Sequence, residues 1–153
     1  LDTQGSYRYR ARRLLDQLQG FVAELRQSGR RVVLVLAPEH GIALRGDALQ
    51  FSVLREIPTP AVTLGPAAIK LIGPGHAEPT EPVRISEPTS FLALSHLLAG
   101  LLQDSPYQAN ANLRRYLTGL PATRLVSENE NFVVLQEGDK TWMKARGQRW
   151  QGM

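Results

Sequence analysis

Apolar residues follow one another without a break over residues 32–36, and three of these five positions are β-branched valines. An unbroken apolar run of this length is typical of a strand covered on both faces, usually in a parallel sheet. The run leads directly into Pro38, Glu39, His40 and Gly41. Because loops at the carboxyl ends of such strands commonly form the ligand crevice of an α/β sheet, the pattern predicts a functional site at these residues.

A helical apolar spacing precedes this strand. The predicted helix begins near Ser6, a plausible N-cap, and runs to about Gln27, with Gly29 as its stop signal. Its apolar stripe consists of Leu14, Leu15, Leu18, Phe21, Val22 and Leu25. Helix, short basic link and buried strand together make one α/β crossover unit.

A second helix is predicted after a proline-rich loop over residues 73–88. Ser86, Glu87 and Pro88 have the types expected at an N-cap and first turn, and the helix is predicted to end near Gln103. Its stripe consists of Leu94, Leu97, Leu98, Leu101 and Leu102. The preceding loop contains glycines but no lysine and helix at the spacing of a P-loop, so we reject that motif.

The remaining pattern predicts short elements. Residues 61–64 and 67–72 are strand candidates, and residues 111–117 a short helix. Residues 132–136 and 140–145 flank a Glu-Gly-Asp turn, which indicates a β-hairpin or meander. The predicted class is therefore α/β, in which the strand at residues 32–36 needs neighbours on both edges. If those neighbours are missing, the chain is a fragment or pairs with another chain.

Composition agrees with one compact domain. The chain has 153 residues, 42% of them hydrophobic, and no cysteine, which excludes disulfides and thiolate metal sites within it. No apolar run reaches the roughly 18 residues that span a bilayer. The net charge of +4 comes largely from Arg8, Arg10, Arg12 and Arg13. We interpret these arginines as a solvated helix face rather than a nucleic-acid surface, and expect no nucleic-acid partner.

Glu39 and His40 combine a carboxylate with an imidazole, which are both ordinary zinc ligands. Neighbours in an extended strand point to opposite sides, so the pair can meet one ion only if the backbone bends. Pro38 and Gly41 bracket the pair and permit a bend. Spacing alone favours instead a strand that ends in a solvated Glu39 and a hydrogen-bonded His40.

Four ordered blocks carry a resemblance over nearly the whole chain: PEHGIALRGD (residues 38–47), LREIPTP (54–60), IKLIG (69–73) and SENEN (127–131). They resemble the C-terminal part of the cellulose phosphoethanolamine transferases of bacterial cellulose secretion, which belong to the alkaline phosphatase-like superfamily. The resemblance implies part of a three-layer sandwich. It also implies that residues 1–153 are the C-terminal portion of a single periplasmic catalytic domain whose upstream half supplies the nucleophilic serine.

The same resemblance implies a function. Zinc bound by Glu39 and His40 activates the serine, which carries phosphoethanolamine from phosphatidylethanolamine to the glucose 6-hydroxyl of cellulose. Arg55 matches the family's phosphate-contacting arginine, and a guanidinium suits that role because its planar fork pairs two phosphate oxygens. The full-length protein is expected to be attached to the inner membrane through an N-terminal region and to meet other cellulose-secretion subunits. This segment alone is expected to be inactive.

Alternatives remain for several of these residues. Arg55 could instead form a surface salt bridge with Glu56 or Asp47, and Arg45 could pair with Asp47. The chain could also be a non-catalytic interaction or glycan-binding module, with Trp142 and Trp150 stacking on sugars, although covering a core edge is the simpler role. His76 is predicted to be exposed without a role, with a surface metal contact as the alternative, and no role is assigned to His96.

Overall fold

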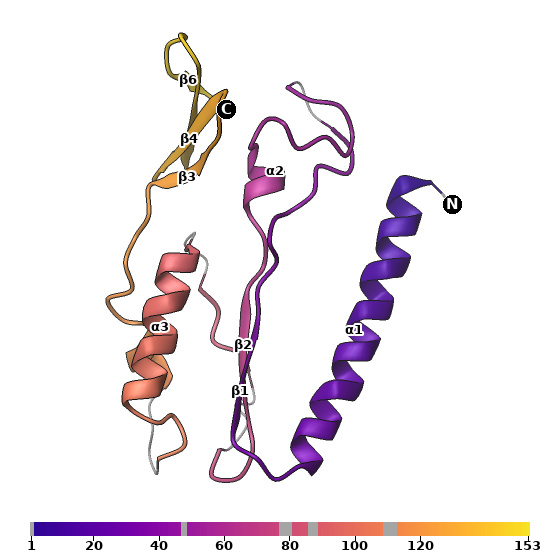
Figure 1. Ribbon diagram of the computed structural model, residues 1–153, viewed down its shortest axis with the longest axis vertical. Helices are drawn as coiled ribbons and strands as arrows, with labels where there is room; N and C mark the ends of the chain where they lie inside the picture. Colours follow the sequence, from indigo (N-terminus) through magenta and orange to yellow (C-terminus); the bar gives the residue numbers. More distant parts are fainter. Residues whose placement is uncertain (1, 47–48, 77–80, 86–88, 109–112) are drawn as a thin grey trace.

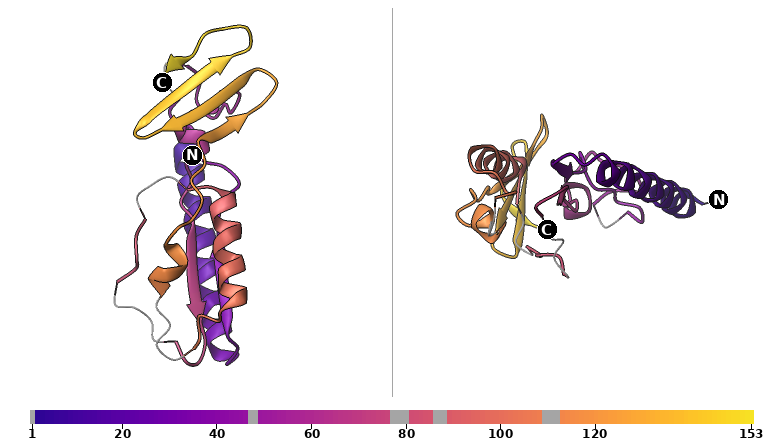
Figure 2. Two further views of the ribbon diagram at one scale, coloured as in Figure 1. Left: turned by 90° about the vertical axis from the view of Figure 1, so that its left-hand side faces the viewer. Right: turned by 90° about the horizontal axis from the view of Figure 1, so that it is seen from below.

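The computed structural model describes residues 2–46, 49–76, 81–85, 89–108 and 113–153. A two-stranded ribbon, β1–β2, lies between a long helix, α1, on one side and a shorter helix, α3, on the other (Figure 1). The view from below shows the same order of the three layers (Figure 2). The four-stranded sheet β3–β6 lies at one end of the long axis. The chain is therefore mixed α/β and ends in a strand meander, as predicted.

Helix α1 spans Thr3–Gln27. Its N-cap is Asp2, whose Oδ1 accepts a hydrogen bond from the backbone N–H of Gly5 at 2.6 Å. The prediction of an N-cap at Ser6 was wrong, because this carboxylate satisfies the first free amides a turn earlier. The predicted stop is confirmed: Gly29 has a φ of 66°, in the left-handed region that glycine adopts without strain.

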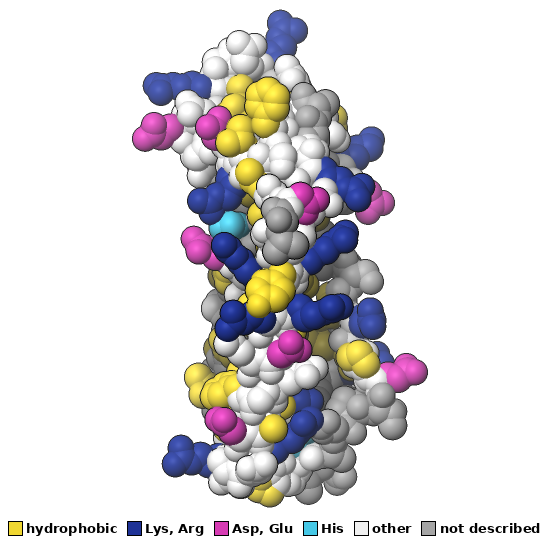
Figure 3. Space-filling model, turned by 90° about the vertical axis from the view of Figure 1, so that its right-hand side faces the viewer, with side chains coloured by type: hydrophobic (Ala, Val, Ile, Leu, Met, Phe, Trp, Pro, Cys, Tyr) yellow, Lys and Arg dark blue, Asp and Glu magenta, His cyan; other side chains and the backbone are white. Residues whose placement is uncertain are grey.

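The apolar stripe of α1 is only partly covered. Leu18, Val22 and Leu25 are half-buried, whereas Leu14 and Phe21 are exposed, and no residue of the helix is fully buried. Figure 3 shows the face of the molecule over this helix, where Lys and Arg side chains surround isolated apolar ones. The basic residues are thus solvated, as predicted.

Strand β1 (Val32–Leu36) pairs with β2 (Ala68–Ile72) in antiparallel register, from Val32 opposite Ile72 to Leu36 opposite Ala68. The expectation of a strand in a parallel sheet, covered on both faces, was wrong for the described residues. Four of the five β1 residues are half-buried and Leu36 is exposed. A two-stranded ribbon with one helix on each side leaves part of its surface uncovered.

Tyr107 fixes one end of the ribbon. Its hydroxyl accepts a hydrogen bond from the Ile72 N–H at 3.1 Å and lies 2.5 Å from the Val32 carbonyl oxygen, to which it can donate. Both partners belong to the terminal register pair. His76 packs edge-on against the Tyr107 ring and is half-buried, so the prediction that it is exposed was wrong.

Residues 60–63 form a short helix, α2 (Pro60–Thr63), and not the strand that was predicted there. Thr59 is at the N-cap position, although its side chain makes no capping hydrogen bond, and Pro60 follows in the first turn, where the fixed φ of proline suits a helix start. The strand prediction counted apolar residues and overlooked this start signal. Val62 is buried and packs the helix onto the rest of the chain.

Helix α3 (Phe91–Gln103) buries Ala93, Leu97 and Leu101. Its N-cap is Ser90, whose hydroxyl accepts from the Ala93 N–H. The predicted cap at Ser86, with Glu87 and Pro88, lies outside the described residues, and the helix begins after it. At the other end of α3, Leu102 is almost fully exposed, contrary to its place in the predicted stripe.

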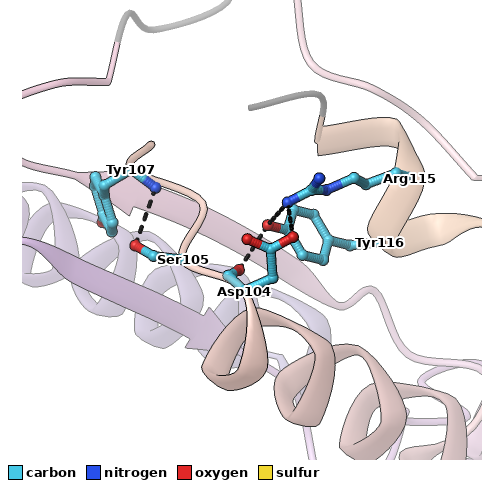
Figure 4. Close-up of polar contacts among 5 residues, drawn as sticks. All are labelled: Asp104, Ser105, Tyr107, Arg115 and Tyr116. Carbon is cyan, nitrogen blue, oxygen red and sulfur yellow. Dashed lines mark hydrogen bonds and ion pairs between the residues drawn. The ribbon is translucent and has the colours of Figure 1, made fainter. Parts of the chain in front are cut away.

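A 3-10 helix, η1 (Leu113–Leu117), follows α3 and is tied to its C-terminal end (Figure 4). The Tyr116 hydroxyl donates to the Asp104 carbonyl oxygen at 2.6 Å, and Arg115 forms an ion pair with the Asp104 carboxylate. Arg115 also donates to the Tyr116 hydroxyl, and this hydrogen bond is the main reason that the pKa of the guanidinium is raised. The pair is half-exposed, which limits its contribution to stability.

The C-terminal meander consists of β3 (Leu125–Glu128), β4 (Phe132–Glu137), β5 (Lys140–Ala145) and β6 (Gln151–Gly152). All neighbours are antiparallel, and the predicted hairpin is confirmed. Val134 and Met143 are register partners and both are buried. Asn129, within the SENEN block, shapes the β3–β4 turn because its Oδ1 accepts from the N–H groups of Asn131 and Phe132.

No helix among the described residues is long and apolar enough to cross a membrane.

Candidate functional site

The site is built on the segment that leaves β1. Gly41 lies against α2, where its N–H donates to the Val62 carbonyl oxygen at 2.6 Å. A Cβ at this position would stand 2.3 Å from the Ala61 carbonyl oxygen, so no residue larger than glycine fits without a backbone shift. Pro38 makes a similar approach to Gly65, whose Cβ would meet the proline ring at 2.4 Å. The two close contacts hold the intervening Glu39 and His40 in place.

His40 is exposed, and both of its ring nitrogens have partners. Nδ1 lies 2.6 Å from the Gly41 carbonyl oxygen, and Nε2 is hydrogen bonded to the Arg55 guanidinium. A carbonyl oxygen can only accept and a guanidinium can only donate, so Nδ1 carries the proton and Nε2 carries the lone pair. The partners therefore fix one neutral tautomer of His40.

Arg55 reaches this histidine from the loop between β1 and α2. The side chain is exposed, and its contact to His40 joins two residues that are 15 positions apart. Arg55 makes no ion pair with Glu56, so that alternative was wrong. The other proposed partner, Asp47, lies outside the described residues. The structure thus brings together two of the three predicted site residues.

Glu39 is exposed and next to His40 in the chain, and it forms no hydrogen bond or ion pair with a described residue. Its carboxylate and the Nε2 atom of His40 are suitable donors for zinc. A histidine that donates its Nδ1–H to a backbone carbonyl and keeps Nε2 unprotonated has the usual arrangement of a metal ligand. Within the described ranges, however, no three His, Cys, Asp or Glu side chains gather in one place. The two residues therefore fit zinc as a partial ligand set.

The loop that carries Arg55 contains two buried polar residues that the sequence did not single out. Gln50 and Thr59 are the buried polar side chains of the described chain, with exposed fractions of 8% and 3%. The Gln50 side-chain amide donates to the Thr59 hydroxyl at 3.2 Å and to the Ile57 carbonyl oxygen at 3.0 Å. The sequence signal that could have found this pair was Thr59, which lies between two prolines at the start of α2.

Other candidates lie apart from this site. A cavity of about 490 Å³ at the opposite end of the ribbon is lined by residues that include Arg26, Ile72 and His76. Its lining contains neither Glu39 nor His40, so we place the candidate chemistry at Glu39, His40 and Arg55 and not in the cavity. His96 is exposed on α3.

The two tryptophans lie on the meander. Trp142 is half-buried, and its indole Nε1 is enclosed without a hydrogen-bond partner among the described residues. Trp150 is 43% exposed, and the ammonium of Lys144 lies 5.9 Å from its ring centroid. Trp142 thus covers a core edge, as the simpler of the two predictions had it.

Residues 1–150 match the family model described as the cellulose biosynthesis protein BcsG C-terminal domain. The chain is 41% identical over 145 residues to the cellulose biosynthesis protein BcsG of Escherichia coli (strain K12), and 39% identical over 145 residues to that of Salmonella typhimurium. Each match covers 94% of this chain but only 26% of the relative. The chain therefore belongs to the family of the BcsG C-terminal domain, which is part of a cellulose biosynthesis protein.

Proposed function

We propose that this chain is the C-terminal portion of a zinc-dependent phosphoethanolamine transferase, which moves phosphoethanolamine from phosphatidylethanolamine to the glucose 6-hydroxyl of cellulose. The observation that carries the proposal is the hydrogen bond between Arg55 and His40 at the end of β1. This hydrogen bond links an arginine, a side chain that commonly binds phosphate, to a histidine, a side chain that commonly binds metal ions. Membership of a cellulose biosynthesis family supports the acceptor.

Glu39 and His40 are the residues of this chain that would hold the zinc ion. A zinc ion at this position would lower the pKa of a coordinated hydroxyl group and so favour its nucleophilic form. Because the described residues offer only a partial ligand set, the remaining ligands and the nucleophile are assigned to parts of the complete protein outside this chain. The relatives, of which the chain spans about a quarter (26%), have room for them.

In this proposal Arg55 has two partners, His40 and the transferred phosphoryl group, and it does not bind both at once. It donates to His40 Nε2 in the present structure, and this nitrogen is the one that a metal would use. If Nε2 held a cation, Arg55 could no longer donate to it, and its guanidinium would be available for the phosphoryl oxygens. A guanidinium close to the transferred group stabilises the negative charge that develops on those oxygens.

The remaining parts of the proposal concern the complete protein. We place its catalytic domain in the periplasm, attached to the inner membrane through an N-terminal region. Its substrates are phosphatidylethanolamine and cellulose, and its partners are other subunits of cellulose secretion. We assign no nucleic acid as a partner, because the basic residues of α1 are spread over a solvated face (Figure 3).

The test measures phosphoethanolamine transfer from phosphatidylethanolamine vesicles to a cello-oligosaccharide by the complete protein. Arg55→Ala is expected to lower the transfer rate by about 10²- to 10³-fold, the usual effect of removing one group that stabilises a developing negative charge. Arg45→Ala is the matched control, because Arg45 is an exposed arginine of the same loop. Equal rates for the two variants would contradict the proposal.

A further inference from the structure

The loop between β1 and α2 has to hold Arg55 in place although its own side chains are largely exposed. All residues from Phe51 to Glu56 are exposed, so packing does little to fix this stretch. Its backbone also includes Val53 at a φ of 61°, a left-handed conformation that is unfavourable for a β-branched residue. Such a conformation persists only where the surrounding structure determines it. The loop therefore needs a specific restraint close to Arg55.

Gln50 provides that restraint. Its side-chain amide bonds to both backbone groups of Ile57: Nε2 donates to the carbonyl oxygen at 3.0 Å, and Oε1 accepts from the N–H at 3.3 Å. Ile57 is two residues after Arg55, so this pairing closes the loop immediately beside the arginine. The amide occupies the place that a neighbouring strand would take in a sheet.

Thr59 completes the pairing on the buried side, because its hydroxyl accepts a hydrogen bond from the Gln50 Nε2 at 3.2 Å. A buried amide with these partners is costly to leave unsatisfied, so the arrangement resists rearrangement. On the other side of the loop, the Val53 N–H donates to the carbonyl oxygen of buried Ala43 at 2.8 Å. Arg55 thus lies between two fixed points.

We propose that Gln50 is a positioning residue, which holds the Arg55 loop so that the guanidinium faces His40. This inference rests on the proposed function, because Arg55 is the group that acts on the substrate. Gln50 itself is buried and acts only through the backbone at Ile57. A misplacement of about 1 Å at a reacting group can lower a rate by up to about 10²-fold. Loss of the restraint should therefore lower kcat more than it changes KM.

The experiment is a double-mutant cycle of transfer rates in the complete protein with Gln50→Met, Arg55→Ala and both together. Methionine keeps the length of the side chain and removes the hydrogen bonds of the amide to Ile57 and Thr59. We expect Gln50→Met alone to lower kcat by about 10-fold, within the range for a misplaced group. In the Arg55→Ala background it should cause no further loss, because the arginine that it positions is absent. Gln103→Met, at an exposed glutamine of α3, is the matched control.

A second readout follows the loop directly. Hydrogen exchange of residues 51–58 should accelerate in Gln50→Met, and exchange of residues 132–145 should not change. If Gln50→Met does not fold, Thr59→Val removes the hydrogen bond between Gln50 and the Thr59 hydroxyl and should give a smaller effect of the same kind. Thr59→Ser keeps the acceptor and should behave as the unchanged protein.

The outcomes separate the two proposals. An equal loss from Gln50→Met in both backgrounds, or no loss in either, would overturn the positioning role while the function of Arg55 stands. If Arg55→Ala itself leaves transfer unchanged, the proposed function of the site is contradicted, and the positioning role with it.

Discussion

The meander and the β1–β2 ribbon differ in how they close. Each strand of the meander pairs with its neighbour in sequence, and the hairpin β4–β5 needs only a short turn. Val134, at its centre, is completely buried. In the ribbon, by contrast, the two strands are connected by the long segment that carries the site. Helix α1 beside the ribbon has no buried residue. The molecule thus combines a locally determined sheet with a site region that depends on contacts between distant residues.

The largest stability effect should come from the centre of the meander. Val134→Ala removes two buried methyl groups and leaves a cavity, so we expect it to lower the free energy of unfolding by about 2 kcal/mol. Leu14→Ala removes a larger side chain from α1, where Leu14 is 60% exposed, and should change the free energy by less than about 0.5 kcal/mol. Urea denaturation of the chain measures both. Equal losses would show that the two regions are packed alike.

A smaller effect is expected at the end of the ribbon. Tyr107→Phe keeps the ring but removes the hydroxyl that bridges Val32 and Ile72, so we expect a loss of about 1 kcal/mol. Hydrogen exchange at residues 32–36 and 68–72 should become faster, with no change in the meander. Tyr9→Phe, at an exposed tyrosine of α1, is the control. A loss that spreads equally over both sheets would contradict the separation of the two regions.

The same contrast explains what the sequence could predict. The hairpin and the stop of α1 at Gly29 depend on residues that are close together in the sequence. Both predictions were confirmed. The direction of β1 depends on its pairing with β2, which is set by residues more than thirty positions away, and that prediction was wrong. The helix at Pro60 was missed although Thr59 and Pro60 signal a helix start.

The site was predictable in part. Residue types and strand position made Glu39 and His40 candidates, but no spacing rule joins His40 to Arg55, because the loop between them has no regular period. Only the resemblance named that arginine. Gln50 escaped notice because a glutamine in a loop normally faces solvent, and its burial follows from the closure of the whole segment onto Ile57.

The central claim is that the end of β1 binds a metal ion through His40. Elemental analysis of the purified complete protein tests it most directly, with His96→Ala as the control for loss of an exposed histidine. The account predicts stoichiometric zinc in the unchanged protein and in His96→Ala, and a large loss of zinc in His40→Ala together with loss of transfer. Full zinc content and full transfer in His40→Ala would contradict it.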